Sequence, residues 1–348
     1  MARVEDLTVR DAKYWLDRYE AQTRRYYRQG DLSIKDLQLL FKDSKNEMLK
    51  EIQSFYAKYG TIQSSPVFTT LADGTKVISS TTKKLVVTPN AANKQLVKGT
   101  RLTRLNQQLD DILFQLSKDQ NDFMKVTLGN IVDGAYPDTV YEAYRGLGIG
   151  QRFDLLNPNI ISQLTRNPVN GQNFSTRVWN NRSRLANTVN QTLNNGIVQG
   201  LSNNEMARRI AKDMDSGFKV AKRLVDTEVT NSYNQATLAG YEASGVVDSY
   251  EYVATLDNRT SEICTSLDGE IFKTSEAITG LTYPPVHVSC RSTTTAHFDT
   301  SKEGLTRIAR NLDGNTYFVP ASMDAKNHRA IYYDKTLTRE QWDKGKRI

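Results

Sequence analysis

The chain has 348 residues, a formal net charge of +7 and a hydrophobic fraction of 38%. This length suits two or three domains of roughly 150 residues each, and the low apolar fraction favours several small cores over one large core. Two cysteines in so long a chain argue against a disulfide-stapled secreted protein. The basic balance mildly favours a polyanionic partner, although an ordinary basic soluble protein has the same balance.

The sequence shows no membrane or secretory segment. No apolar run reaches the ~18–20 residues that cross a bilayer. The first residues, MARVEDLTVRDAKYWLDRYE, lack the apolar core of a secretory signal. We therefore expect a protein that folds in a cytoplasm and has no membrane partner.

The first 60 residues have the apolar spacing of helices. Residues 8 to about 59 predict two helices, separated at the sequence QGDLS. Ser33 is a candidate N-cap of the second helix, with Asp36 three residues later. The apolar residues that follow at helical spacing are Leu37, Leu40, Phe41, Met48, Ile52, Phe55 and Tyr56.

The composition then changes to β-branched residues. Residues 66–88, centred on Asp73-Gly74, predict a β-hairpin and a third short strand. Helix is expected again over 99–130, with a further short helix over 138–145. The apolar stripe of the longer helix consists of Leu105, Leu109, Ile112, Leu113 and Leu116. Residues 146–174 are rich in Gly, Pro and Asn and predict a connector.

Residues 175–245 predict three helices. The first has one apolar face, formed by Val178, Leu185, Val189, Leu193 and Ile197, and ends before Gly200. Ser202 and Glu205 form a capping box at the start of the second, in which Met206, Ile210 and Met214 face inward. The third helix covers 218–244.

Strand patterns follow this helical region. The sequence VVDSYEYVATLD alternates like a strand, and LDGEIF predicts a turn that leads into another strand. The whole sequence therefore predicts a mainly α protein with a small α+β C-terminal module, elongated and built from several parts. The expected divisions are an N-terminal helical region (1–60), a β-hairpin insertion (61–98), a helical region and connector (99–165), a module of helices followed by a small α+β part (166–298), and a C-terminal tail (299–348).

Both cysteines and one of the three histidines lie in the stretch DNRTSEICTSLDGEIFKTSEAITGLTYPPVHVSCRS. His287 and Cys290 are three residues apart, and Cys264 lies upstream across a Gly-containing turn. Thiolate and imidazole are good zinc ligands, so these three residues are candidates for a zinc site. The candidates for a fourth ligand are Asp257, Asp268, His297 and water. Alternatively, Cys264 and Cys290 are small core residues, or they form a disulfide.

No catalytic pattern is recognisable. Neither cysteine has a nucleophile signature around it, and the chain has no Walker loop, dinucleotide-binding glycine pattern or metalloprotease helix. Thr227-Glu228 lies in a polar helix without a second carboxylate or histidine at a matching spacing. We interpret it as solvated or internally hydrogen-bonded. Asp257, Arg259 and Thr260 predict a turn, and Asp268-Gly269 predicts a hairpin.

Basic residues on the first two helices of 175–214 are candidate contacts to double-stranded DNA. They are Arg177, Arg182, Arg184, Arg208, Arg209 and Lys212. Gathered on one surface, they would neutralise several phosphates, and sequence-independent binding would weaken steeply with salt. The alternative is a solvated face. No aromatic residues interleave with them, so base stacking is not expected.

Four motifs occur in order over residues 165–298: QG-S-NE-A, TE at Thr227-Glu228, D-RT…C…LDG, and P-H-SCR. Together they resemble the phage Mu F-like minor head protein family. The resemblance implies a non-enzymatic minor head protein of a tailed bacteriophage, inside the head near the portal. It implies contacts with portal protein, DNA and, as further candidates, scaffolding or major capsid protein, and a role in head assembly and DNA packaging or ejection. The virion would be its location, and the host cytoplasm during assembly.

The sequence departs from the family at the cysteine cluster. Many members have Cys-x-x-Cys at the first limb and Cys-x-Cys at the second, whereas Ser261 and Ser292 stand here at two of those positions. Two soft ligands are therefore missing, and zinc stays an open expectation. The alternative function is a phage-delivered or maturation enzyme, either a hydrolase or a toxin-like effector. Some relatives carry toxin domains after this module, but only about 50 residues follow Asp299 here.

Overall fold

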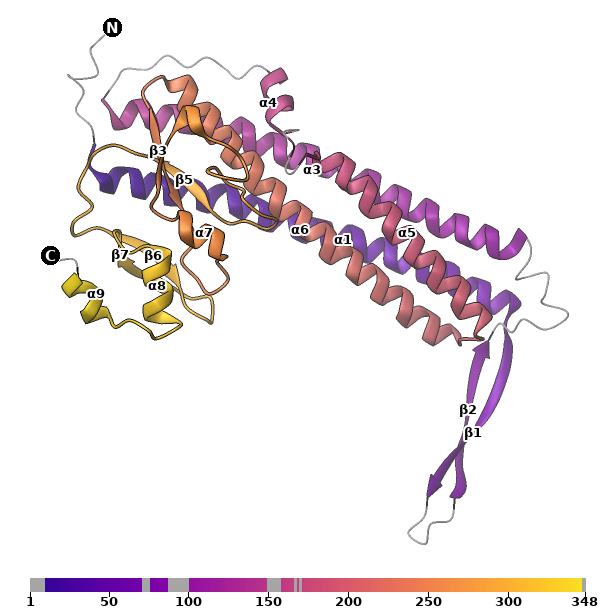
Figure 1. The fold of residues 1–348 in the computed structure, drawn as a ribbon. Coiled ribbons are helices and arrows are strands. Elements are labelled where there is room, and N and C mark those ends of the chain that lie inside the picture. Colours follow the sequence, from indigo (N-terminus) through magenta and orange to yellow (C-terminus); the bar gives the residue numbers. More distant parts are fainter. Residues whose placement is uncertain are drawn as a thin grey trace. The chain divides into compact units, whose positions relative to one another are not determined.

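The computed structural model of the protein describes residues 10–70, 76–86, 100–148, 158–165, 168 and 171–345. It confirms the mainly α architecture with a small α+β part (Figure 1). The chain divides into two compact units that cut across the consecutive ranges expected from the sequence. Unit 1 consists of residues 1–33, 124–174 and 223–348, and unit 2 consists of residues 34–123 and 175–222. None of the described helices is long and apolar enough to cross a bilayer.

Three helices are longer than the sequence predicts. α1 (Ala12–Tyr59) has no break at QGDLS, and α3 (Thr100–Gly146) continues through Pro137. α6 (Asn203–Ser244) replaces two expected helices and ends, as predicted, at Gly245, which has a φ of +63°. The expected divisions within these three helices were therefore wrong.

The break expected near Ser33 was based on Gly30 in the sequence QGDLS, but Gly30 lies within the continuous helix α1, at a close contact between helices. A Cβ on Gly30 would lie 2.9 Å from Cγ1 of Val229, so the glycine allows α1 and α6 to approach closely in unit 1. Ser33 is not an N-cap, because its Oγ donates to the carbonyl oxygen of Gln29 at 2.8 Å inside the helix.

Unit 2 packs helices through apolar stripes. The predicted stripe of α3 is buried, and α5 (Phe174–Val198) buries its predicted face except for Leu185, which is half-buried. On α6 the predicted inward residues Met206, Ile210 and Met214 are also buried. The capping box is confirmed, since Ser202 N donates to Glu205 Oε2 at 3.0 Å and Glu205 N donates to Ser202 Oγ at 3.3 Å.

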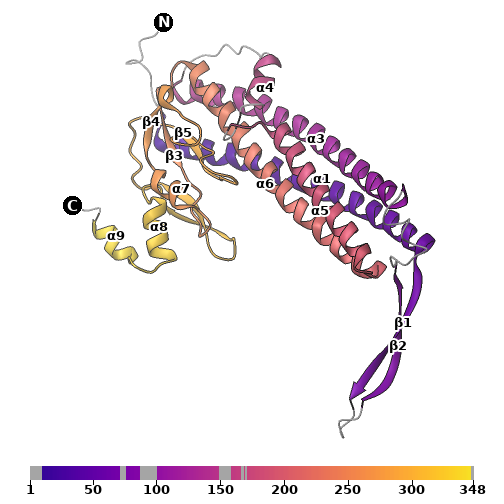
Figure 2. The same ribbon diagram turned by 45° about the vertical axis from the view of Figure 1, so that its right-hand side comes forward.

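The predicted hairpin also belongs to unit 2. β1 (Thr61–Thr70) pairs antiparallel with β2 (Lys76–Val86), with an irregularity between Val67 and Phe68. β2 is continuous, so the expected third strand does not form, and Asp73-Gly74 lies outside the described residues. The hairpin extends away from the helix ends of its unit (Figures 1 and 2). An ion pair of 3.7 Å joins Lys84 to Glu205 at the start of α6.

Unit 1 adds two small sheets to its helices. The first has the order β4-β3-β5, with both pairs antiparallel, and the second is the hairpin β6-β7. The strands are β3 (Ser249–Val253), β4 (Ile271–Lys273), β5 (Thr293–Ala296), β6 (Thr306–Arg310) and β7 (Thr316–Pro320). The shorter helices are α4 (Pro158–Thr165), α7 (Glu262–Leu267), η2 (Thr274–Glu276), α8 (Ala325–Tyr332) and α9 (Arg339–Gly345).

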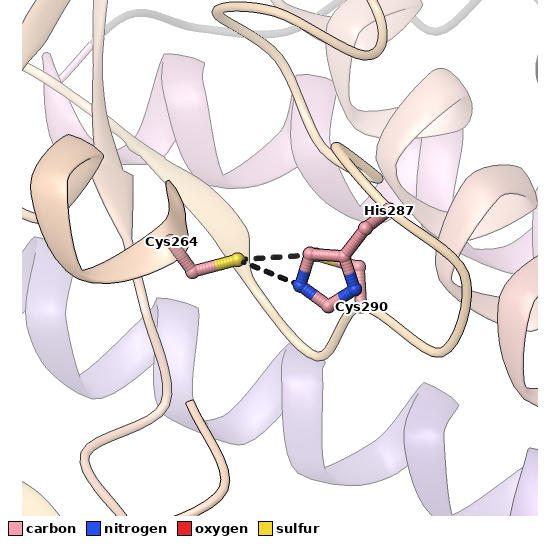
Figure 3. A group of neighbouring side chains, drawn as sticks. All are labelled: Cys264, His287 and Cys290. Atoms are coloured by element: carbon pink, nitrogen blue, oxygen red, sulfur yellow. Dashed lines mark hydrogen bonds between the residues drawn. The ribbon is translucent and has the colours of Figure 1, made fainter. Parts of the chain in front are cut away.

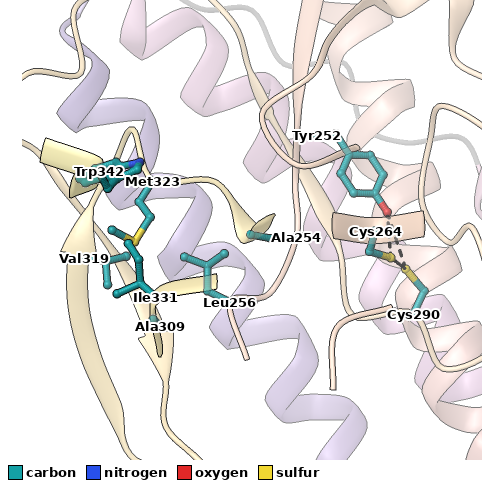
Figure 4. Packing of buried hydrophobic residues seen from close by; sticks show 11 residues of the cluster. Tyr252, Ala254, Leu256, Cys264, Cys290, Ala309, Val319, Met323, Ile331 and Trp342 are labelled. Atoms are coloured by element: carbon teal, nitrogen blue, oxygen red, sulfur yellow. Dashed lines mark hydrogen bonds between the residues drawn. The ribbon is translucent and has the colours of Figure 1, made fainter. Parts of the chain in front are cut away.

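Two buried clusters hold unit 1 together. One joins Tyr252 and both cysteines to residues of β6, β7, α8 and α9 (Figure 4). The other joins Trp15 of α1 to Tyr250, Tyr283 and Ala296. The residues after 299, which the sequence suggested as a tail, are therefore folded into the same core as the cysteines.

Candidate metal centre

The cysteine–histidine cluster is built from a short helix and a tight turn. Cys264 is the third residue of α7, and its N–H donates to Oγ of the N-cap Ser261 at 3.2 Å. His287 and Cys290 lie on a turn before β5, closed by a hydrogen bond of 3.2 Å from Cys290 N to His287 O. Ser289 has a φ of +58°, and this left-handed residue makes the turn tight enough for both side chains to reach Cys264 (Figure 3).

The structure brings the three candidate ligands together. Cys264 Sγ lies 3.2 Å from His287 Nε2 and 3.7 Å from Cys290 Sγ. Both sulfurs belong to buried side chains, whereas His287 is half-buried. The Tyr252 hydroxyl donates to Cys264 Sγ at 3.4 Å and lies 4.0 Å from Cys290 Sγ (Figure 4).

The hydrogen bond between the two thiols shifts their pKa values in opposite directions. The hydrogen bond from Cys290 is the largest influence on Cys264 and, against the effect of burial, lowers the pKa of Cys264. The same hydrogen bond and burial raise the pKa of Cys290. Because the thiolate is the form that binds metal, the lowered pKa favours Cys264 over Cys290 as a candidate ligand.

The two serines that replace family cysteines lie beside this cluster. Ser261 Oγ is 2.9 Å from His287 Nε2. The Ser292 hydroxyl is one of the groups whose hydrogen bonding lowers the pKa of Cys264. Hydroxyl groups of two serines therefore lie beside the three candidate ligands.

The distances fit a tetrahedral zinc ion with an open position. Zn–S bonds of about 2.3 Å and Zn–N bonds of about 2.0–2.1 Å place two sulfurs about 3.8 Å apart and a sulfur and nitrogen about 3.6 Å apart. The observed separations are 3.7 Å between the two sulfurs and 3.2 Å between Cys264 Sγ and His287 Nε2, and all three ligand atoms lie within 4.8 Å of one another. Among the described residues no further Cys, His, Asp or Glu joins the three.

Asp257, the first candidate for the fourth ligand, forms an ion pair with Arg291. Arg291 Nη2 donates to Asp257 Oδ1 at 2.8 Å, and Arg291 Nη1 donates to Oδ2. Burial raises the pKa of Asp257, but the hydrogen bonds and charge of Arg291 outweigh burial, and the net shift is downward. Asp257 also accepts from Arg259 N at 2.9 Å, which confirms the predicted turn.

The remaining protein candidates also lie outside the cluster. Asp268 is fully buried and accepts from both Nη atoms of Arg307, at 2.9 and 3.0 Å. It also accepts from Ala254 N and Ala325 N, both at 2.7 Å. The turn predicted here is present, since Gly269 has a φ of +86°, but it joins α7 to β4, so the expected hairpin was wrong. These four hydrogen bonds were not predictable from the sequence. His297 Nε2 lies 3.5 Å from Asp299.

A buried polar face of α6 holds the turn that carries His287 and Cys290. Ser289 N donates to Thr227 Oγ1 at 2.9 Å, Thr230 Oγ1 donates to Cys290 O at 2.8 Å, and Asn234 Nδ2 donates to Ser292 O at 3.3 Å. These α6 residues share one helical face because they are three and four positions apart. Sequence reasoning missed this face. Its signal was the run TEVTNSYNQAT, which is long and polar but carries a single charge.

The basic residues expected to contact DNA lie in unit 2 and differ in their surroundings. Three are exposed on one stretch of α6: Arg208, Arg209 and Lys212. On α5, Arg184 is exposed, Arg177 is half-buried, and Arg182 is paired with Asp110 at 2.5 Å. The α6 group is therefore the stronger candidate for contacts to phosphate, because an arginine already paired with a carboxylate has fewer donors left for a phosphate.

Comparison with known proteins confirms the resemblance noted in the sequence. Residues 187–295 match the family model of Phage Mu protein F like protein. The "NAD(+)--arginine ADP-ribosyltransferase EFV" of Enterococcus faecalis (strain ATCC 700802 / V583) is 29% identical over 142 residues, which cover 40% of this chain and 29% of that protein. "Minor head protein GP7" of Bacillus phage SPP1 is 24% identical over 217 residues, which cover 58% of this chain and 70% of GP7. No solved structure matches.

Proposed function

We propose that this chain is a minor head protein of a tailed bacteriophage and that it acts by binding and assembly. The observation that carries the proposal is the family match over residues 187–295, supported by similarity along 70% of the SPP1 minor head protein. The matched range contains α6, the β4-β3-β5 sheet and the cysteine–histidine cluster. Hydrogen bonds from Thr227, Thr230 and Asn234 of α6 hold the turn that carries His287 and Cys290, so the matched range includes connected parts of unit 1.

The direct test is quantitative mass spectrometry of purified, DNA-filled particles. The amount of this protein is measured against the portal protein and the major capsid protein in the same sample. We expect a few copies per head. Absence from the particle would remove the head-protein proposal and leave a role outside the virion.

An enzymatic role is the competing proposal, and the similarity to an ADP-ribosyltransferase gives it little support. The chain aligns with 29% of that protein. The test is incubation of the purified chain with labelled NAD⁺ and arginine-rich acceptor proteins, in which transfer of label to the acceptors is measured. We expect no transfer of label, and transfer that exceeds a heat-inactivated control would favour the enzyme.

The finer proposal is that the α6 surface contacts packaged duplex DNA while the protein is bound near the portal. Binding to a labelled duplex is measured as a function of salt for the triple variant R208Q/R209Q/K212Q. The matched control K35Q/K42Q/K50Q removes three exposed charges from α1 in the same unit. We expect the α6 variant to reduce the slope of log K against log salt by about 2–3, because each phosphate contact contributes about 0.9. Equal slopes for both variants would exclude the α6 surface, and co-purification with portal protein tests the portal contact.

We also propose that zinc links α7 to the turn before β5 through Cys264, His287 and Cys290. When bound, the ion cross-links two segments that are more than 20 residues apart in the sequence. Metal analysis after purification under reducing conditions should give one zinc per chain, and Co²⁺ should give a thiolate charge-transfer band that C264S and C290S abolish. A chain without metal, whose unfolding midpoint is unchanged by a chelator, would leave the cysteines as ordinary core residues.

A further inference from the structure

A second site lies in unit 1, apart from the three metal-ligand candidates. It is a cavity of about 470 Å³ between one face of α1 and a wall formed by β6 and the segment after β3. The α1 side contributes Tyr19, Glu20, Thr23, Arg24, Tyr27, Arg28 and Asp31. The opposite side contributes Ala254, Thr255, Leu256, Arg291, Arg307, Ile308, Arg310 and Thr316. Its volume falls within the range of about 300–1,000 Å³ that is typical of small-ligand sites.

The walls of this α1–β6 pocket are fixed by hydrogen bonds. Ile308 N donates to Glu20 Oε1 at 3.1 Å, which ties β6 to α1. The Tyr27 hydroxyl donates to the carbonyl oxygen of Ser292 at 3.0 Å. On the far wall, Arg310 N donates to Leu256 O at 2.9 Å. The pocket is therefore preformed, and a ligand does not have to order its walls on binding.

Positive charge dominates the lining, which contains five arginines against one glutamate and one aspartate. Arg291 and Arg307 are paired with Asp257 and Asp268. The other arginines, Arg24, Arg28 and Arg310, are exposed, and no hydrogen bond or ion pair joins their guanidinium groups to any residue in the described part of the chain. They are therefore open to an anion from solution.

We propose that the α1–β6 pocket binds the phosphate of a nucleotide unit through Arg24, Arg28 and Arg310. Guanidinium forks match the oxygen atoms of phosphate and form strong charge-assisted hydrogen bonds with them. Tyr19 and Tyr27 provide aromatic surface for a base. The phosphate belongs either to a free nucleotide or to a nucleic-acid strand. This inference does not rest on the proposed function.

The test uses the purified full-length chain and two probes at low salt. Pyrophosphate is titrated calorimetrically, and a fluorescein-labelled single-stranded oligothymidylate is followed by anisotropy. We expect pyrophosphate to bind and to displace the oligonucleotide. R24Q, R28Q and R310Q should each weaken binding of pyrophosphate roughly tenfold, the effect of losing one charge-assisted hydrogen bond.

R25Q is the matched control. Arg25 is the neighbour of Arg24 on α1, but it does not line the pocket and is paired with Asp138 at 2.9 Å. Its removal changes the net charge equally, so we expect binding within a factor of about two of wild type. Near-ultraviolet circular dichroism establishes that each variant is folded, and R28K should recover part of the affinity lost in R28Q.

The two sources of phosphate are separated by comparing affinities. Equal affinity for thymidine monophosphate and for the oligonucleotide assigns the pocket to a free nucleotide, whereas much tighter oligonucleotide binding assigns it to a strand. The proposal is overturned if pyrophosphate neither binds nor competes, or if R25Q weakens binding as much as R24Q does. It is also overturned if an acidic peptide such as polyglutamate binds more tightly than both phosphate ligands.

Discussion

The two units bury the same helix in opposite ways. In unit 2, α6 buries an apolar face that includes Ile210 and Met214. In unit 1, its continuation buries polar residues such as Thr230 and Asn234, which bond to the backbone of the turn that carries the cluster. A buried helix face therefore does not have to be apolar when the groups packed against it are unpaired backbone donors and acceptors.

This difference has consequences for how each unit responds to substitution. An apolar core tolerates changes of shape if the volume is kept, because no partner is left unsatisfied. A buried polar network does not, because removing one partner leaves the other desolvated and unpaired. We therefore expect conservative substitutions of buried residues to lower the free energy of unfolding only slightly in unit 2 and strongly in unit 1.

The largest effect is expected for Asp268→Ala in unit 1. The substitution leaves the guanidinium of Arg307, whose side chain is 8% exposed, buried without its carboxylate, together with two orphaned backbone N–H groups. The free energy of unfolding, measured by chemical denaturation, should fall by about 3–5 kcal/mol. Asp313→Ala, at an exposed site after β6, should change it by less than about 0.5 kcal/mol. Similar values for the two variants would refute the importance of the Asp268–Arg307 pair.

The corresponding change in unit 2 is Leu193→Ala, at a fully buried position of α5. The cavity left behind should lower the free energy of unfolding by about 3 kcal/mol. Leu193→Met keeps the volume and should lower it by less than about 1.5 kcal/mol. Denaturation curves of the two variants measure this difference. If Leu193→Met lowers the free energy of unfolding as much as Leu193→Ala does, the core of unit 2 does not tolerate changes of side-chain shape.

The units should also differ in their response to acid, because all three histidines lie in unit 1. Burial, and next the charge of Arg307, lower the pKa of His328 to about 4. The unfolded chain therefore takes up a proton on this residue near pH 6.5 while the folded chain does not. Stability from His328 is complete above pH 6.5 and is lost as pH falls toward 4, by roughly 2–3 kcal/mol. His328→Phe should flatten this part of the curve, and an unchanged slope would contradict the buried neutral imidazole.

The same contrast explains what the sequence could predict. Apolar periodicity located the stripes of unit 2, and the Ser202–Glu205 capping box was visible as a pattern. The continuity of α1 and α3 through unit 1 was not predictable from local residues. α3 continues through Pro137 beside a close approach to α6, where a Cβ on Gly240 would lie 2.7 Å from Cβ of Thr139. Tertiary packing of this kind overrides local propensity.

The sequence indicated the candidate ligands of the metal centre, but it did not indicate the residues that hold these ligands in place. Cys264, His287 and Cys290 stood out by chemistry and spacing alone. The sequence did not indicate that Thr227 and Thr230 hold the turn, because a threonine in a helix has the same appearance whether it is exposed or bonds to a distant turn. The partners of Asp268 were equally hidden, since Arg307 lies 39 residues away in the chain.

The smallest predicted effect tests the polar face of α6 most directly. Thr230→Val keeps the shape of the side chain but removes the hydroxyl that donates to the buried carbonyl of Cys290 at 2.8 Å. We expect a loss of about 1–2 kcal/mol in the free energy of unfolding, the cost of leaving that carbonyl unpaired. The matched control is Thr188→Val on α5, whose exposed hydroxyl donates only to Arg184 O in its own helix and should matter little. If both variants are neutral, apolar packing rather than the threonine hydroxyl holds the turn, and the contrast between the units would rest on Asp268 alone.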